Sequence, residues 1–244
     1  LWYGGGLKKD FDKATEMQQA TALKFEHLLE MVATTFPKMR IRFSTSNPQD
    51  MHQEVLHVIA KHSNICKHIH LPVQSGNTAV LERMNRSYTR EWYMDRIEAI
   101  RRIVPGCAIS TDIITGFCGE TEEEHEETKS LMDWVEYDYA YMFKYSERPK
   151  TLAERRFDDD VPEEVKGRRL TEIVDMQQAH SLKNNQKQIG NIDRVLVEGY
   201  SKRSQDDMCG RNSKNSMIVF PKGDFGKGDY VMVKINDCTS ATLK

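Results

Sequence analysis

Closely spaced cysteines are missing from this chain of 244 residues. No two cysteines stand three or four positions apart, and their number is odd: Cys66, Cys107, Cys118, Cys209 and Cys238. A scattered, odd set argues against a disulfide framework and indicates a reducing compartment, so we expect a cytoplasmic protein. The spacing makes no metal site, and no metal ligand or catalytic residue is predicted in the chain.

Long apolar runs and a strong charge of one sign are missing as well. No stretch approaches the roughly 18 apolar residues of a membrane span, which argues against a membrane protein. The net charge is −2, but from Lys187 to Lys244 ten Lys or Arg stand against seven Asp or Glu, and this mildly basic end favours an anionic partner. An initiator methionine is missing too, since the chain opens at Leu1, and this indicates a fragment.

Four segments show the apolar periodicity or the capping pattern of helices. They are residues 25–36, residues 55–59 after Pro48, residues 93–104 between Thr89 and Pro105, and the segment that follows the T-x-x-E capping box of Thr121 and Glu124.

Short runs with strand character alternate with these helices: "RIRFSTS" near Ile41, "HIHLPVQ" near Ile69, "AISTDIITGF" near Ile109 and "YAYMFKYS" near Tyr141. Strand and helix alternating about every 30 to 40 residues is typical of the βα repeat of a parallel sheet or barrel. Right-handed crossovers place the carboxyl ends of all strands at one edge, where α/β folds bind their ligands. The predicted fold class is therefore α/β.

Small and polar residues recur where three of these strands end, in "PVQSG", "GFCGET" and "YSERP". Side chains such as Gln74 and Ser75 suit ribose hydroxyls, and a turn at Gly116 would leave bare backbone beside a planar base. Phe143 and Tyr145 alternate onto one face, where an aromatic ring would meet an adenine edge. The alternative is that the glycines serve turn geometry only. We favour a ligand site.

The pattern changes after residue 160. Residues 162–190 predict one long helix that ends at Gly190. Beyond it, "DRVLVEGYS", "NSMIVFP" and "GDYVMVKIND" alternate like the strands of a small OB-like barrel. The basic residues of this part either contact phosphates or keep a small barrel soluble: Lys202, Arg203, Arg211 and Lys214.

Two further features have ordinary explanations. The glutamates of residues 122–127 are interpreted as a solvated helix face near the positive helix end, rather than as catalytic carboxylates. His68 and His70 share one face of a strand and would suit a metal ion, but no third ligand has a fitting spacing, so ordinary packing is favoured.

In four motifs the chain resembles the radical S-adenosylmethionine (SAM) methylthiotransferases, most closely their tRNA-modifying branch (MiaB type). The motifs are "HLPVQSGNTAVLERMNRSYTREWY", "ISTDIITGFCGETEEEHEET", "YAYMFKYSERPKT" and "VPEEVKGRRL", in this order. The resemblance implies an incomplete radical SAM, TIM-like (βα) barrel in residues 1–160 and a connecting helix in residues 161–189. It further implies an RNA-binding, all-β TRAM domain in residues 190–244.

The resemblance also implies a chemistry. In this family one [4Fe-4S] cluster, bound by three cysteines, reduces S-adenosylmethionine to a 5′-deoxyadenosyl radical, and a second [4Fe-4S] cluster supplies sulfur for a methylthio group. In the tRNA branch the target is carbon 2 of an isopentenylated adenosine next to the anticodon. The implied partners are a tRNA anticodon stem-loop and a reductant for the clusters, while the protein positions and shields the cofactors.

By this resemblance, Arg86 is the candidate for the methionine carboxylate, and Ile114 and Gly116 would lie near adenine. The whole implied cofactor site is Gln74, Ser75, Arg86, Ile114, Gly116, Phe143 and Tyr145. The implied RNA-binding residues are Arg148, Lys202, Arg203, Arg211 and Lys214.

The chain departs from the family in one respect that matters. The family's C-x-x-x-C-x-x-C loop is absent, as is the N-terminal domain with its own three cysteines, and four of six βα units are expected to remain. We therefore expect a fragment that is inactive by itself. Two alternatives stay open: the branch that modifies an aspartate of a ribosomal protein, which "PVQSG" and the basic tail disfavour, and a non-catalytic RNA-binding protein.

Overall fold

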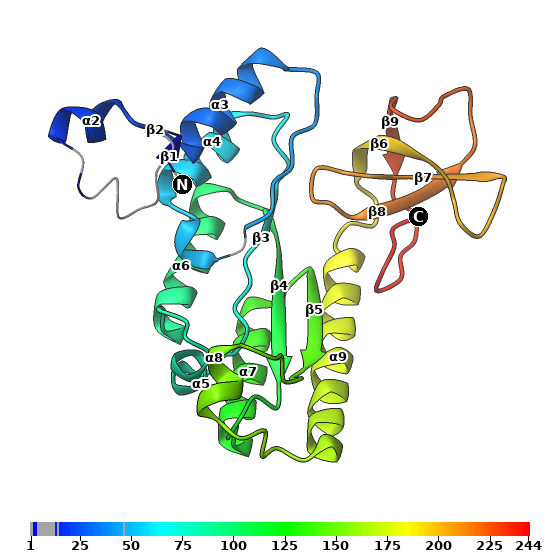
Figure 1. Cartoon of the computed structure of the whole chain (residues 1–244). Coiled ribbons are helices and arrows are strands. Elements are labelled where there is room, and N and C mark those ends of the chain that lie inside the picture. The colour runs from blue at the N-terminus through cyan, green and yellow to red at the C-terminus, as the bar shows by residue number, and fades with distance from the viewer. Residues whose placement is uncertain (1, 4–12, 14, 46) are drawn as a thin grey trace.

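Two larger sheets joined by one long helix dominate the described part of the chain (Figure 1). The structure is a computed structural model, and it describes residues 2–3, 13, 15–45 and 47–244. The first sheet is parallel, with strand order β3-β4-β5, and the second is antiparallel, with order β8-β7-β6-β9. A two-stranded pair, β1 (Trp2–Tyr3) with β2 (Leu23–Lys24), lies with helix α2 (Glu16–Thr21) near the start.

The helices form where the apolar periodicity predicts them. The expected ones are α3 (Phe25–Thr35), α4 (Gln53–Lys61), α6 (Arg90–Ile103) and α7 (Glu122–Val135). The hydroxyl of Thr89 caps α6 by accepting from the Trp92 amide, and Thr121 with Glu124 closes the expected capping box on α7. Four short helices in the described part of the chain were not predicted: α2, η1 (Pro48–Asp50), α5 (Thr78–Arg83) and α8 (Leu152–Arg156).

The parallel sheet contains three of the four expected strands: β3 (His68–His70), β4 (Ala108–Thr115) and β5 (Tyr139–Lys144). The expectation of a strand near Ile41 is wrong. Ile41 makes a single parallel bridge with Ile65, which stands between a turn and β3, so no further pair of residues extends the ladder. The α/β prediction is confirmed, but the parallel sheet has three strands instead of the expected four.

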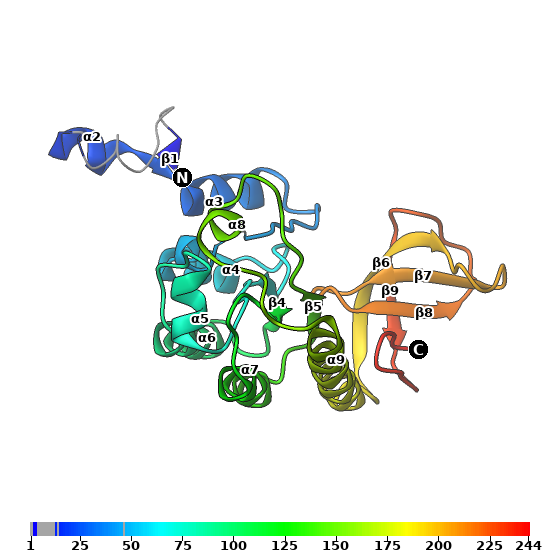
Figure 2. The same ribbon diagram turned by 60° about the horizontal axis from the view of Figure 1, so that its bottom comes forward.

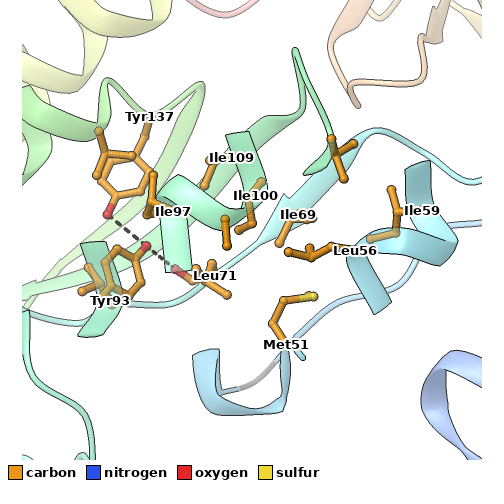
Figure 3. Close-up of a cluster of buried hydrophobic side chains, with 14 of the residues drawn as sticks. Met51, Leu56, Ile59, Ile69, Leu71, Tyr93, Ile97, Ile100, Ile109 and Tyr137 are labelled. Atoms are coloured by element: carbon orange, nitrogen blue, oxygen red, sulfur yellow. Dashed lines mark hydrogen bonds between the residues drawn. The ribbon is translucent and has the colours of Figure 1, made fainter. Parts of the chain in front are cut away.

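Helices cover one face of the parallel sheet, and Figure 2 shows α6, α7 and α9 in an arc around it. A cluster of buried aliphatic side chains fills the space between helices and strands (Figure 3). Two tyrosines tie this core together, since Tyr137 donates to the Tyr93 hydroxyl at 3.0 Å and Tyr93 donates to the Leu71 carbonyl at 2.8 Å. On the opposite face, β5 presents three half-exposed rings: Tyr139, Tyr141 and Phe143.

The C-terminal sheet is curled and has its own small core (Figure 1). Its strands are β6 (Ile192–Tyr200), β7 (Asp207–Arg211), β8 (Met217–Pro221) and β9 (Tyr230–Lys234). The all-β prediction is confirmed, but β7 was missed, because "DMCGR" has little strand character.

Helix α9 (Glu163–Gln186) is the predicted connecting helix. With 24 residues it is about 36 Å long. It begins at the carboxyl end of the parallel sheet and leads past β5 to the C-terminal sheet (Figure 1). Gly190 is not its C-cap, because the helix already ends at Gln186. Gly190 instead lies in the turn before β6, with φ of 91° and its amide donating to Ile235 O. No described helix is long and apolar enough to span a membrane.

Candidate functional site

Two adjoining cavities open at the carboxyl end of β4 and β5. Their volumes are about 510 Å³ and 280 Å³, and the first falls in the range of sites for small molecules and cofactors. Both are lined by Gln74, Arg86, Ile114, Tyr145, Thr151 and Ala153. The larger one also reaches Asp112, Phe143, Lys144, Ser146 and Arg148. Most of the predicted cofactor residues are therefore brought together at one place.

Gln74 enters this site with a backbone conformation that few residues adopt. Its φ is 72°, in the left-handed region that costs a residue with a side chain about 1 kcal/mol or more. Its amide donates to Asp112 O and its carbonyl accepts from the Ile114 amide, both at 2.9 Å. Strand β4 thus enforces this conformation, and strain of this kind is concentrated at ligand sites.

Charged groups of both signs line the larger cavity. Arg86 has no ion pair or side-chain hydrogen bond within the described part of the chain, so its guanidinium is available to an anion. Asp112, which sequence analysis did not single out, adds a carboxylate to the same cavity. Its one ionic neighbour among the described residues is His70, whose Nε2 lies 3.4 Å from Asp112 Oδ1. This arrangement suits a ligand that carries both a carboxylate and an amine or hydroxyls.

Apolar and aromatic groups line the rest. Phe143 on β5 is 54% exposed, and Ile114 on β4 is half-buried beside it, in register with it across the ladder. The ring of Tyr145 packs edge-on against Phe117 at a centroid distance of 4.9 Å, and burial raises the pKa of its hydroxyl to about 12. Tyr145 therefore stays protonated and serves as a wall of the cavity.

Two predicted cofactor residues lie outside the cavity lining. Ser75 is fully buried, and its hydroxyl lies 3.3 Å from the hydroxyl of Thr128 on α7. Gly116 has a φ of 68°, and a Cβ there would overlap the Cγ of Lys166. The space on the Cβ side of this glycine is therefore filled by a lysine side chain, and its place near adenine stays a prediction.

Buried charges hold the turn after β4. The carboxylate of Glu120 accepts from the Gly116 amide and from Arg169 Nη1, the latter at 2.9 Å. The side chains of Arg169 and Glu120 are 4% and 1% exposed. Burial raises the pKa of Glu120, while Arg169 and the Gly116 amide oppose that rise.

The block of glutamates that follows is not simply a solvated face. Glu122 pairs with Arg168 and Arg169 of α9, and Glu124 pairs with Arg83. These partners lie far away in the sequence, so the block could not reveal them.

The predicted RNA-binding residues divide into two groups. Lys202 and Arg203 are exposed in the turn after β6, and Arg148 is exposed at the mouth of the larger cavity. By contrast, Arg211 Nη1 donates to Asn215 O at 2.8 Å and its Nε lies 3.6 Å from Glu198. Lys214 faces a third cavity, of about 270 Å³, between the two sheets, beside Gln188.

A joint fastens the C-terminal sheet to the amino end of the parallel sheet. The Arg40 guanidinium donates to the carbonyls of Arg211 and Arg194, and it lies 5.1 Å from the ring centroid of Tyr230. Arg194 stacks closer on the same ring, at 3.9 Å. The segment that fails to form a strand near Ile41 therefore serves as a docking point.

The histidine pair on β3 packs as predicted. His68 Nε2 and His70 Nδ1 both lie 2.9 Å from the Ser110 hydroxyl on β4. Burial lowers the pKa of His68 to about 4, and the nearby His70 acts in the same direction. Within the described ranges no three His, Cys, Asp or Glu gather as metal ligands would.

The fold has a cavity at the carboxyl ends of parallel βα units, followed by a long helix and a small curled β-sheet. Together these features define an α/β barrel-type enzyme domain with an appended β-module. Residues 7–132 match the family described as the Radical SAM superfamily, and this chain belongs to that superfamily. Residues 186–244 match the TRAM domain.

Similar curated proteins include two from Flavobacterium psychrophilum and Flavobacterium johnsoniae, each named tRNA-2-methylthio-N(6)-dimethylallyladenosine synthase. Each is 60% identical over the whole of this chain, which covers 51% of its length. The chain thus spans about half the length of these relatives. Among solved structures, the coproporphyrinogen III oxidase of Escherichia coli is 14% identical to this chain, with a TM-score of 0.47. The match covers 68% of this chain and 45% of the oxidase, and no conclusion is based on so slight a likeness.

Proposed function

We propose that this chain is part of a tRNA methylthiotransferase, which adds a methylthio group to carbon 2 of an isopentenylated adenosine next to the anticodon. One observation carries the proposal: 60% identity along the whole chain to relatives named tRNA-2-methylthio-N(6)-dimethylallyladenosine synthase. Because the chain covers 51% of those relatives, the activity is ascribed to the whole protein and not to these residues alone.

The cavity residues fit S-adenosylmethionine as cofactor. When bound, it supplies the adenosyl radical on which chemistry of this class depends. The unpaired Arg86 would hold the methionine carboxylate, and Asp112 would accept from its amine or from ribose hydroxyls. Ile114 and Phe143 would enclose the adenine, since they stand side by side on β4 and β5. Gln74, locked by its two bonds to β4, would orient a polar edge of the cofactor.

Iron–sulfur clusters do not fit the described residues in the same way, because no three-ligand group occurs among them. We therefore derive no step for the two [4Fe-4S] clusters, which in this proposal belong to other parts of the whole protein, together with the reductant that serves them.

The RNA partner in this proposal is a tRNA anticodon stem-loop. The exposed cations Lys202 and Arg203 on the TRAM domain suit its phosphates, and Arg148 would meet the backbone near the cavity. The side chains of Arg211 and Lys214 contact Glu198 and Gln188 inside the chain, so we rank these two residues below Lys202 and Arg203 as RNA contacts.

The test is an assay of the full-length protein, purified without oxygen and supplied with reductant, S-adenosylmethionine and tRNA bearing isopentenyladenosine. Mass spectrometry of the digested nucleosides should show the methylthio product, and Arg86→Met should raise the KM for S-adenosylmethionine. Ribosomal protein serves as the competing substrate. Product on an aspartate of that protein, with none on tRNA, would replace the proposal with the other branch of the family.

A further inference from the structure

The motif "VPEEVKGRRL" has no part in the proposed function so far. It comprises residues 161–170 and forms the first turns of α9. Two of its basic side chains, Lys166 and Arg169, are almost fully buried, at 1% and 3% exposure. Buried cations of this kind are rare unless each is paired, so their surroundings need an explanation.

Lys166 runs beneath the turn that follows β4. Its aliphatic stem occupies the space where a Cβ on Gly116 would lie, so the glycine is required by the lysine. Its ammonium reaches both oxygens of Asp159, at 2.6 and 2.7 Å, and Glu163 at 3.5 Å. The same ammonium lies 5.6 Å from the ring centroid of Tyr145, which lines both cavities.

Arg169 supports the same turn from one helical turn further along. It donates to the carbonyl and the carboxylate of Glu120, each at 2.9 Å, and Glu120 in turn accepts from the Gly116 amide. The first turns of α9 therefore hold the backbone after β4 through Glu120 and the ring of Tyr145 through Lys166.

We propose that Lys166 is a positioning residue for the cofactor site: acting through the Tyr145 ring and the Gly116 turn, it sets the wall against which the adenosyl part of the cofactor lies. This inference rests on the proposed function, from which it takes the identity of the cofactor. Lys166 does not line either cavity, so its effect is indirect. A cation over an aromatic face fixes that ring more firmly in a desolvated place than at the surface.

The test compares three variants of the full-length protein. Lys166→Met keeps the buried stem and removes the charge, Lys166→Arg keeps the charge, and Lys183→Met removes an exposed lysine from the far end of the same helix, where it pairs with Glu136. Calorimetric titration with S-adenosylmethionine should show about a tenfold weaker Kd for Lys166→Met, while Lys166→Arg and Lys183→Met bind as the wild type does.

A second measurement does not depend on the cofactor. The ring resonances of Tyr145, assigned with Tyr145→Phe, should shift in Lys166→Met and stay in place in Lys183→Met. Unshifted resonances, or wild-type affinity in Lys166→Met, would overturn the inference and leave the proposed function standing. If the wild type fails to bind S-adenosylmethionine while the resonances shift, the proposed cofactor is wrong, and with it the adenosyl wall, although Lys166 still positions Tyr145.

Discussion

The two ends of the parallel sheet are built from similar charged residues used in different ways. At the carboxyl end, Arg169 and Glu120 pair with side chains that are 4% and 1% exposed. At the amino end, near the joint with the TRAM domain, Lys183 and Glu136 pair at 57% and 32% exposure. Burial, and not the number of charges, decides how much stability is lost when a pair is broken. Water screens the exposed pair, whereas a buried charge that loses its partner stays uncompensated.

The largest effect is expected from breaking the buried pair. Arg169→Met leaves Glu120 buried without its cation, so the free energy of unfolding should fall by about 3–5 kcal/mol. Its neighbour Arg168 is 46% exposed, and Arg168→Met should cost less than about 1 kcal/mol. Urea denaturation measures both. Equal losses in the two variants would show that burial of a charge pair does not set how much stability is lost when the pair is broken.

Two glycines of the turn after β4 provide a sharper comparison within one end. Gly116 and Gly119 both have φ of 68°, so replacement by alanine strains each backbone by about 1–2 kcal/mol. A Cβ on Gly119 meets nothing within 4 Å, whereas one on Gly116 overlaps the buried stem of Lys166.

Gly116→Ala should therefore lose about 1–3 kcal/mol more than Gly119→Ala in thermal or urea unfolding. Only the Gly116 variant should also weaken binding of S-adenosylmethionine. Identical behaviour of the two variants would show that the turn geometry, and not the lysine beneath it, requires these glycines.

At the amino end, Arg40→Met removes the guanidinium that bonds two carbonyls of the C-terminal sheet. Because Arg40 is only partly buried, the expected loss is about 1–2 kcal/mol. Lys38→Met is the control, since Lys38 is an exposed cation in the same segment. Limited proteolysis between α9 and β6 should accelerate in the Arg40 variant alone. Unchanged cleavage would show that other contacts hold the TRAM domain.

The smallest effect is a dependence on pH that arises at His68, the first residue of the edge strand β3. His68 is held neutral, with a pKa of about 4 against 6.5 in the unfolded chain. The unfolded form therefore takes up a proton first, and stability falls as the pH drops from about 6.5 towards 4.

His68→Phe should show a flatter decline over that range than the wild type or than His57→Phe, which changes an exposed histidine. Denaturation at pH 7, 6 and 5 measures the slope. Parallel curves for all three proteins would show that His68 does not cause the loss of stability at low pH.

Sequence patterns located the elements and the edge where the site forms. Apolar spacing predicted α3, α4 and α6, and a capping box predicted α7. Polar residues at strand ends pointed to the carboxyl edge of the sheet. Five of the seven predicted cofactor residues line the cavities there: Gln74, Arg86, Ile114, Phe143 and Tyr145. Their contact with a cofactor stays a prediction.

Other members of the site carried no local signal. Asp112 looked like one polar residue inside a strand, and Lys166 looked like a surface lysine of a helix. Arg211 looked free for RNA, yet Glu198 and Asn215 occupy it. In each case the partner is decided by which elements pack together.

The sequence by itself determined the α/β class, the long helix, the small β-domain and the edge that carries the ligand site, because periodicity and turn chemistry act over a few residues. Only the tertiary structure decided why Gly116 must be glycine and why Gln74 is strained. It also decided how α9 supports the cavity. All three features depend on contacts such as that of Lys166 with Gly116, fifty positions apart in the sequence. The energy of such contacts comes from burial, which exists only once the chain has folded.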